Sequence, residues 1–247
     1  MTDRMTTQPR PRTLVLASGS AGRLRVLRDA GFAPEVQVSG VDESTDDGLD
    51  TAAVVSVLAE RKAAAVAGQC PDALVLGCDT LLDFEQTAFG KPASAEQAEA
   101  LWQRLSGRQA TLLTGHCLID TRRGLRAWGV GRTVVRFGTP SAAELAAYVA
   151  TGEPMQVAGG FSIDGFAAPF IEGVDGDPNN VIGLSLPLLR RLLADLGLAI
   201  TDLWRPARSG LPYAGRETAA AGAAGPGTVA PPGSHPGPGP GADQTGA

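Results

Sequence analysis

Leu74-Val75-Leu76-Gly77-Cys78-Asp79-Thr80 is the stretch that decides the fold of this chain. The apolar run at residues 73–78 is typical of a buried central strand. We expect this strand to end at Asp79, which directly follows the apolar residues. A carboxyl group in such a place needs a polar or charged partner if it is buried. The stretch therefore predicts a central strand that carries an acidic group to a functional site.

Strand and helix patterns alternate on both sides of this stretch. We expect further strands at residues 13–17 and 34–38, and a hairpin-like pair at 110–120 and 125–137. Ser94 is expected to cap one helix, and Ser141 with Glu144 is expected to begin another through a capping box. Gly31 and Gly68 are expected to end two others. The ranges of the expected helices are 20–30, 51–67, 94–105, a segment starting at 141, and 187–196. The fold class is therefore α/β, with a mixed sheet and flanking helices.

Composition divides the chain into three parts. The 247 residues are 43% apolar, which is ordinary for a globular protein with a full core. We expect the folded domain at residues 12–204, after a flexible N-terminus at 1–11. Residues 205–247 are rich in Ala, Gly and Pro, so we predict a disordered tail there.

Charge and cysteine content exclude several classes of protein. The net charge of −5 argues against a nucleic-acid binder, which would normally carry a basic face. Three cysteines without a CxxC pair indicate reduced thiols and a cytoplasmic protein. The N-terminus is polar without an apolar segment, so we expect no secretory signal there. No apolar run approaches the roughly 20 residues of a membrane span, so we expect no membrane partner.

The first candidate site is the loop Ser18-Gly19-Ser20 with Arg23 one turn into the following helix. Small residues let backbone N–H groups approach an anion, and the positive end of the helix faces the same way. Arg23 could add a forked contact to phosphate oxygens. The alternative is a plain strand-to-helix turn in which Ser20 caps the helix and Arg23 is solvated.

Two carboxylates form the second candidate. Glu43 follows the strand expected at residues 34–38, and Asp79 ends the central strand. Together they could hold Mg²⁺, which prefers oxygen ligands and shares them with substrate phosphates. One of them could instead take a proton from an attacking water. The alternative for Glu43 is an acidic surface loop.

Lys91, in Gly90-Lys91-Pro92, could supply a positive charge for phosphate, although Pro92 excludes a P-loop. Lys62 could reach the same place from its helix, or it could lie on the solvent face. His116 is interpreted as a buried structural histidine. Cys78 has no histidine placed to activate it as a nucleophile.

Taken in order, these stretches resemble the Maf family of nucleoside triphosphate pyrophosphatases over residues 13–196. The presence of several separate motifs in one order makes the resemblance specific. The motifs are Leu16-Ala17-Ser18-Gly19-Ser20 with Arg23, Val41-Asp42-Glu43-Ser44, Leu58-Ala59-Glu60-Arg61-Lys62-Ala63, Gly77-Cys78-Asp79-Thr80, Gly90-Lys91-Pro92, Gly152-Glu153-Pro154, Ala158-Gly159, and Gly176-Asp177-Pro178-Asn179-Asn180-Val181-Ile182-Gly183-Leu184.

The resemblance implies an enzyme that hydrolyses nucleoside triphosphates to monophosphates and pyrophosphate with Mg²⁺ or Mn²⁺. Such an enzyme would clear noncanonical or surplus nucleotides. The resemblance also implies a homodimer and a fold similar to the inosine triphosphate pyrophosphatases, with an elongated mixed sheet in two lobes around a cleft. By family position Asp79 is the proton acceptor, and Glu43 and Asp79 hold the metal. The implied substrate-binding residues are Ser18, Arg23, Lys62, Thr80 and Lys91.

Some positions depart from the family pattern. The first loop has Ala21-Gly22-Arg23 where the family often has Pro-Arg-Arg, and Gln156-Val157 replaces a charged pair. Thr80 resembles the branch that acts on dTTP and UTP, but Gly22 and Asp164 match neither branch, so the preferred base stays open. Two other functions also stay open: a non-catalytic nucleotide-binding regulator linked to cell division, and a phosphatase acting on monoesters.

Overall fold

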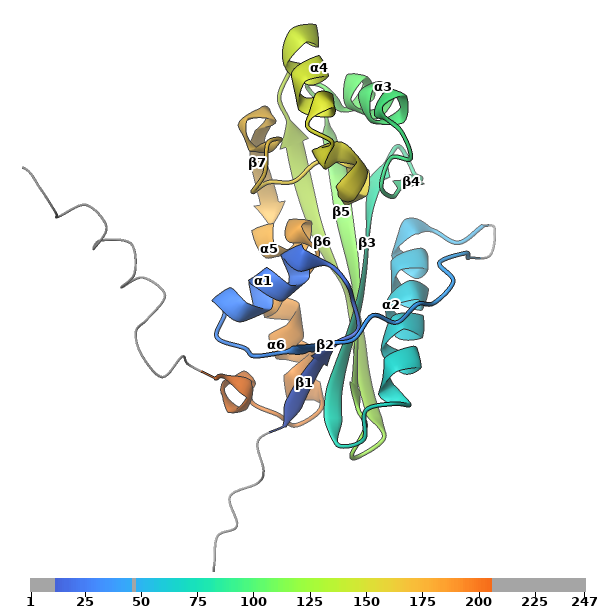
Figure 1. Cartoon of the computed structure of the whole chain (residues 1–247), viewed down its shortest axis with the longest axis vertical. Helices are drawn as coiled ribbons and strands as arrows, with labels where there is room; N and C mark the ends of the chain where they lie inside the picture. The colour runs from blue at the N-terminus through green and yellow to red at the C-terminus, as the bar shows by residue number, and fades with distance from the viewer. Residues whose placement is uncertain (1–11, 46–47, 206–247) are drawn as a thin grey trace, which may run out of the picture. The chain divides into compact units, whose positions relative to one another are not determined.

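The sheet of this protein is mixed, which confirms the predicted α/β class. The computed structural model describes residues 12–45 and 48–205. The flexible segment predicted at 1–11, and the predicted tail from residue 206 onward, lie outside the described residues. The described part contains a seven-stranded sheet (Figure 1). Its strands are β1 (Thr13–Leu16), β2 (Glu35–Val36), β3 (Ala73–Phe84), β4 (Thr87–Phe89), β5 (Gln109–Asp120), β6 (Leu125–Phe137) and β7 (Ile171–Gly176).

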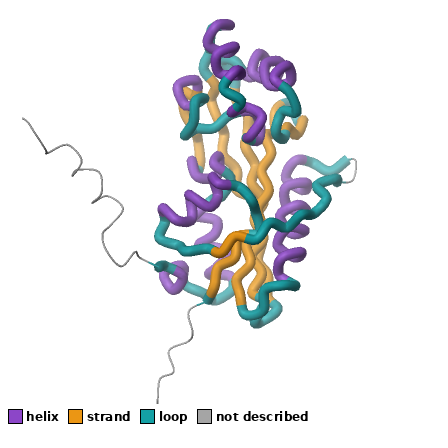
Figure 2. Tube along the Cα trace, in the orientation of Figure 1, coloured by secondary structure: helices purple, strands orange, loops and turns teal. Residues whose placement is uncertain are grey.

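The strand order is β2-β1-β3-β5-β6-β7, with β4 paired to the second half of β3. The pairs β1–β2 and β1–β3 are parallel, whereas β3–β4, β3–β5, β5–β6 and β6–β7 are antiparallel. The hairpin expected around residues 121–124 is therefore present as β5–β6. Figure 2 shows these strands side by side, with helices around them.

The central strand is longer than the sequence predicted. We expected β3 to end at Asp79, but it continues to Phe84 and pairs with β5 from Leu74 to Asp83. The continuation is stabilised by the antiparallel partner on one edge and by β4 on the other. Asp79 consequently lies in the middle of a strand, opposite Gly115 of β5.

The helices follow the capping signals closely. Ser20, Ser94 and Ser141 each accept a backbone N–H at a helix start, and Ser141 with Glu144 forms the expected capping box. The described helices are α1 (Ala21–Asp29), α2 (Thr51–Ala67), α3 (Ala95–Leu105), α4 (Ala142–Ala150), α5 (Pro178–Ile182) and α6 (Leu186–Asp195). Short 3₁₀ turns lie at Glu153–Gln156, Ala158–Gly160, Ala168–Phe170 and Ile200–Leu203. No helix among the described residues has the length and apolar character needed to cross a bilayer.

Sequence reasoning missed three elements, namely β4, β7 and α5. β7 ends at Gly176, and α5 begins at Pro178. Asp177 caps α5 by accepting the backbone N–H of Asn179, and Pro178 occupies its first position. All three elements are short, which explains why their periodicity was not visible in the sequence.

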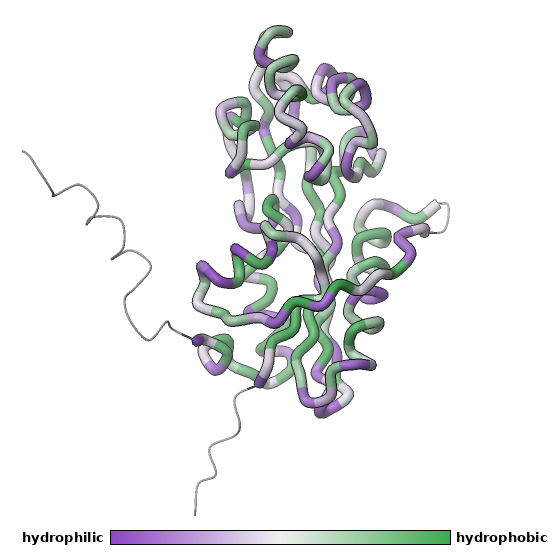
Figure 3. The backbone as a smooth tube through the Cα atoms, in the orientation of Figure 1, coloured by the Kyte–Doolittle hydropathy of each residue, from purple (hydrophilic) through white to green (hydrophobic). Residues whose placement is uncertain are grey.

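Two hydrophobic clusters pack around the sheet. One joins α1 and α6 to β1 and the first half of β3, and includes Leu27, Leu74 and Leu192. The other joins α3 and α4 to the second half of β3 and to the ends of β5 and β6, and is centred on Trp102. Hydrophobic residues accordingly run along the strands in Figure 3. The long strands β3, β5 and β6 connect the two clusters.

Helix α2 approaches its face of the sheet unusually closely because two strand positions lack a side chain. A Cβ built on Gly77 would lie 2.3 Å from the carbonyl oxygen of Ala59, and one on Gly115 would lie 2.1 Å from that of Val55. Both distances are far below van der Waals contact with helix backbone. Glycine at these positions therefore sets the distance between α2 and the sheet.

We predict that Gly115→Ala lowers the free energy of unfolding by about 1–3 kcal/mol, because the new methyl group forces the α2 backbone away from β5. Gly68→Ala is the matched control. Gly68 follows α2 in a right-handed conformation with no atom within 4 Å of the added carbon. Its free energy of unfolding should change by no more than about 0.5 kcal/mol. Urea unfolding measures both, and equal stability of the two variants would contradict the close approach.

Candidate functional site

Asp79, Lys62 and Glu43 form one charged cluster on the α2 face of the sheet. The Nζ atom of Lys62 lies 2.6 Å from Oδ1 of Asp79 and 2.6 Å from Oε1 of Glu43. Lys62 is only 7% exposed, because it shares the inward face of α2 with Ala59 and Ala63. The alternative in which Lys62 points to solvent is therefore wrong.

The pKa values of the two acids are shifted in opposite directions, that of Asp79 upwards and that of Glu43 downwards. Burial raises the pKa of Asp79 above its usual range, although the charge of Lys62 opposes this. The hydrogen bond from Lys62 lowers the pKa of the more exposed Glu43. Environments that push two carboxyl pKa values apart are how one site obtains both a base and a permanently charged group. Asp79 suits the first role and Glu43 the second.

The loop that carries Glu43 is held in place locally. Oxygens of Asp42 accept the backbone N–H and the hydroxyl of Ser44 at 2.9 and 2.7 Å. The guanidinium of Arg61 donates to the carbonyl oxygen of Ser44. Arg61 precedes Lys62 on α2, so a single helix turn positions both the loop and the ammonium group beside it.

Arg23 is buried, and each of its three side-chain nitrogens donates one hydrogen bond, which contradicts the solvated alternative. Its Nη1 donates to Oγ of Ser18 at 2.9 Å, and its Nη2 donates to Oγ1 of Thr80 at 3.0 Å. Its Nε donates to the carbonyl oxygen of Gly183 at 2.9 Å. Arg23 thus ties the loop after β1, the middle of β3 and the end of α5 into one unit.

Thr114 and Asn180 extend this unit and were not identified from the sequence. The hydroxyl of Thr114 lies 3.1 Å from that of Thr80 and donates to the carbonyl oxygen of Asn180 at 3.0 Å. Gly22 also has a packing role, because a Cβ there would lie 3.1 Å from the Ile182 side chain. The residue types alone do not indicate that Thr114, Asn180 and Gly22 lie at the site, since their contacts depend on where β5 and α5 lie in the fold.

Lys91 lies apart from the ion pairs of Lys62. It is exposed in the turn after β4, where it lines a cavity of about 330 Å³ next to α3. The turn is fixed by a hydrogen bond from Gly159 to the carbonyl oxygen of Gly90 at 2.9 Å. Its charge nevertheless helps to lower the pKa of Glu43. Lys91 therefore acts on Glu43 electrostatically without contacting the ion pairs of Lys62.

The donor set of Glu43 and Asp79 fits a magnesium-type ion. Their oxygens both contact the Lys62 nitrogen at 2.6 Å, so they lie no more than 5.2 Å apart around one positive charge. No group of three or more His, Cys, Asp or Glu that could hold a metal occurs among the described residues. Mg²⁺ suits such a sparse site, because it is usually bound by one or two carboxylates, waters and substrate phosphates.

Two other residues considered from the sequence are structural. Burial raises the pKa of the Cys78 thiol to about 12, so it stays protonated and is no nucleophile. His116 is 1% exposed, and its Nε2 accepts the backbone N–H of Ser185 at 2.9 Å. Its Nδ1 lies 3.0 Å from the carbonyl oxygen of Thr114, which assigns the proton to Nδ1. The interpretation of His116 as a buried structural histidine is confirmed.

Comparison with known proteins gives results that agree with each other. The family described as Maf-like protein matches residues 13–196. A protein named nucleoside triphosphate pyrophosphatase from Streptomyces coelicolor is 58% identical over 205 residues, which cover 82% of this chain and 99% of that protein. Proteins of the same name from Streptomyces avermitilis and Salinispora tropica are 55% and 49% identical. They cover 82% and 83% of this chain, and the matches span 98% and 93% of those proteins.

We predict that His116 stays neutral in the folded protein until the pH approaches 4, because burial lowers its pKa from 6.5 to about 4. The unfolded chain takes up this proton at higher pH. The stabilisation from neutral His116 is therefore complete above pH 6.5 and is lost as the pH falls towards 4. Imidazole ¹⁵N shifts, recorded for folded and urea-unfolded protein, measure both pKa values. Titration of folded His116 near 6.5 would contradict the hydrogen bond from Ser185.

Proposed function

Because this chain belongs to the Maf-like protein family, we propose that it is a nucleoside triphosphate pyrophosphatase, a hydrolase that converts nucleoside triphosphates to monophosphates and pyrophosphate. The observation that carries the proposal is the buried carboxylate of Asp79 beside Lys62 and Glu43. A sensor that only binds a nucleotide does not need a base at this position, whereas hydrolysis does. Removal of surplus or noncanonical nucleotides is the role we infer.

In the proposed reaction a water oxygen attacks the α-phosphorus of the substrate. The Asp79 carboxylate takes the proton from this water, and its raised pKa makes it a better base than an ordinary aspartate. The bond between the α-phosphorus and the bridging oxygen breaks, and pyrophosphate leaves with the electron pair. Lys62 offsets the negative charge that develops on the phosphate oxygens.

We propose that Glu43 and Asp79 hold Mg²⁺ or Mn²⁺ together with substrate phosphates. The bound ion would polarise phosphoryl oxygens and offset the charge of the leaving group. The low pKa of Glu43 supports this role, because a metal ligand must be ionised. With a metal present, Lys62 would be free to turn from the two acids towards the substrate.

The positions of Ser18, Thr80 and Lys91 in the structure suggest how each would contribute to substrate binding. Ser18 and Thr80 hold Arg23, so we propose that they shape the phosphate site chiefly by fixing its guanidinium. Lys91 is exposed in the turn after β4, and we propose that it contacts the outer phosphates from there. The preferred base is measured by comparing turnover of different nucleoside triphosphates.

We further propose a cytoplasmic enzyme whose catalytic domain is residues 12–204 and that has no nucleic-acid partner. The free thiols of Cys70, Cys78 and Cys117 support a reducing compartment. The net charge of −5 supports the absence of a nucleic-acid partner. An antiparallel bridge between Phe32 and Trp204 supports the end of the domain.

We also propose that the enzyme is a homodimer. Strand β7 pairs only with Thr133–Phe137, so the earlier part of β6 has one strand partner among the described residues. This part carries Trp128, which is 67% exposed. A free strand edge beside an exposed aromatic residue favours association.

We predict that Trp128→Ser converts the dimer to a monomer, as measured by size-exclusion chromatography with light scattering. Phe166→Ser is the matched control, because Phe166 is equally exposed but lies outside the sheet. It should leave the molar mass unchanged. A monomeric parent protein, or equal effects of the two substitutions, would contradict the proposed interface.

We predict that Asp79→Asn lowers the turnover number about 10²–10⁴-fold, because the amide has the same shape but cannot accept the proton. Asp83→Asn, on the same strand and face, is the control and should retain the parent rate. The assay uses Mg²⁺ or Mn²⁺ with dTTP, UTP, CTP and modified nucleotides, and it separates pyrophosphate from orthophosphate.

The products discriminate among the alternatives. Monophosphate with pyrophosphate supports the proposed reaction, and the ranking of substrates gives the preferred base. Orthophosphate as the product would indicate a phosphatase instead. Tight nucleotide binding without turnover by the folded, metal-loaded protein would indicate a regulator. A fully active, well-folded Asp79→Asn variant would refute the role of this carboxylate.

A further inference from the structure

One ion pair joins the two hydrophobic clusters that pack around the sheet. Arg25 of α1 contacts Asp164, which lies in the loop of residues 161–167. Leu27 places α1 in the first cluster, around α6, and Phe161 places the loop in the second cluster, around α3 and α4. No other ion pair among the described residues connects these two clusters.

Each partner of this ion pair lies close in sequence to a segment of the candidate site. Arg25 follows Arg23 by two residues on α1, and Arg23 is the group that ties the loop after β1 to β3. The loop on the other side follows Gly159, whose backbone N–H donates to the carbonyl oxygen of Gly90 at 2.9 Å, next to Lys91. The ion pair therefore links the Arg23 side of the site to the Lys91 side.

The loop that carries Asp164 is fixed within the second cluster. The carboxylate of Glu153 accepts the backbone N–H of Phe166 at 2.8 Å and that of Ala167 at 3.2 Å. A Cβ on Gly165 would lie 2.2 Å from Oε2 of Glu153, so only glycine permits this close contact. Asp164 is therefore presented to α1 by a loop with its own anchor.

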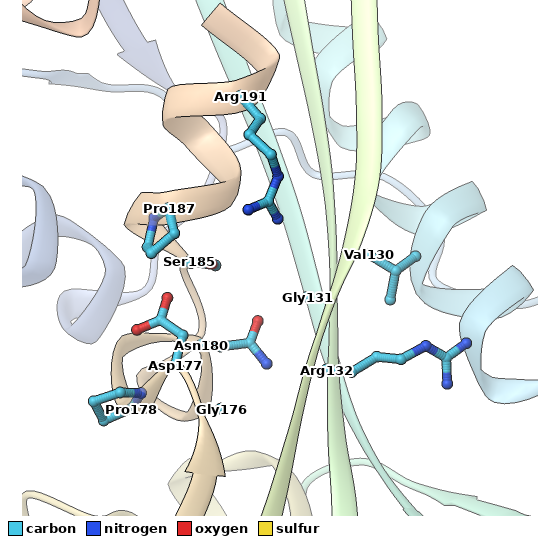
Figure 4. A pocket seen from close by; sticks show the side chains of 10 residues that line it. All are labelled: Val130, Gly131, Arg132, Gly176, Asp177, Pro178, Asn180, Ser185, Pro187 and Arg191. Carbon is cyan, nitrogen blue, oxygen red and sulfur yellow. The ribbon is translucent and has the colours of Figure 1, made fainter.

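The packing between the two clusters leaves space on the β6 side. A second cavity, of about 530 Å³, lies between β6 and the segment that joins β7 to α6. Figure 4 shows that Val130 and Arg132 point away from this cavity and that Gly131 has no side chain to fill it. These three residues of β6 belong to neither cluster. Unfilled space at the junction leaves the clusters room to shift relative to each other.

We propose that the Arg25–Asp164 ion pair is a clamp, which holds the two sides of the candidate site together around a bound nucleoside triphosphate and opens when the ligand leaves. The identity of the ligand rests on the proposed function. The side chain of Arg25 is 52% exposed and that of Asp164 is 29% exposed. Exposed ion pairs are weak and are screened by salt, so this contact opens and closes without a large barrier.

Release of fluorescent α,β-methylene analogues of UTP, CTP, ATP and GTP from the full chain tests the clamp, because their α–β bridge resists hydrolysis. Stopped-flow displacement gives the dissociation rate constant. Asp164→Asn keeps the shape of the side chain but removes its charge, so this constant should rise about two- to fivefold. Arg25→Gln should have a similar effect. Arg28→Gln is the matched control, because Arg28 is also exposed on α1 but forms no ion pair among the described residues. It should leave the constant unchanged.

The double variant Arg25→Asp with Asp164→Arg separates a clamp from a simple effect of charge near the ligand. It restores the ion pair with reversed signs, so the dissociation rate constant should return to the parent value. Failure of the reversed pair to restore it would overturn the clamp. Added KCl should accelerate release from the parent more than from Asp164→Asn, because salt screens the pair.

The outcomes also distinguish the clamp from the proposed function. Binding of an analogue with the same dissociation rate constant in the parent and in Asp164→Asn would overturn the clamp and leave the proposed function standing. If the folded, metal-loaded protein bound none of the analogues and released no pyrophosphate, the proposed function would be refuted and the clamp with it.

Discussion

The distance between α2 and the sheet is the constraint on which the candidate site depends. Gly77 and Gly115 have no side chain, so the backbone of α2 packs directly against β3 and β5. At this distance the Lys62 ammonium donates to Asp79 while its stem stays in the protein interior. A larger separation would admit water between the helix and the strand. Asp79 would then lose both its ion pair and the burial that raises its pKa.

The site therefore has two parts with different construction. Lys62, Asp79 and Glu43 form a charged part, in which one ammonium group makes ion pairs with both carboxylates. Arg23, Ser18 and Thr80 form a part that is already satisfied by hydrogen bonds from three segments. The first part suits chemistry, and the second suits positioning.

Local sequence signals predicted the elements that are long and capped. Ser94 and the Ser141–Glu144 box gave the starts of α3 and α4, and the apolar runs gave β1, β3 and the β5–β6 hairpin. The length of β3 was underestimated, because its second half depends on pairing with β5 rather than on an apolar run. The Arg23 contacts could not be predicted either, since Gly183 is 160 residues away in the chain. The family resemblance named Arg23 without giving its partners.

The same glycines also have a consequence for how the chain selects its strand pairing during folding. If β5 slipped by one residue against β3, its side chains would exchange faces. Thr114 or His116 would then project where Gly115 now meets the Val55 carbonyl, and α2 could not dock. With β5 in the wrong register, the apolar face of α2 would stay exposed to water, and the free energy from burying it would be lost. Docking of α2 is therefore compatible only with the native register of β5 against β3.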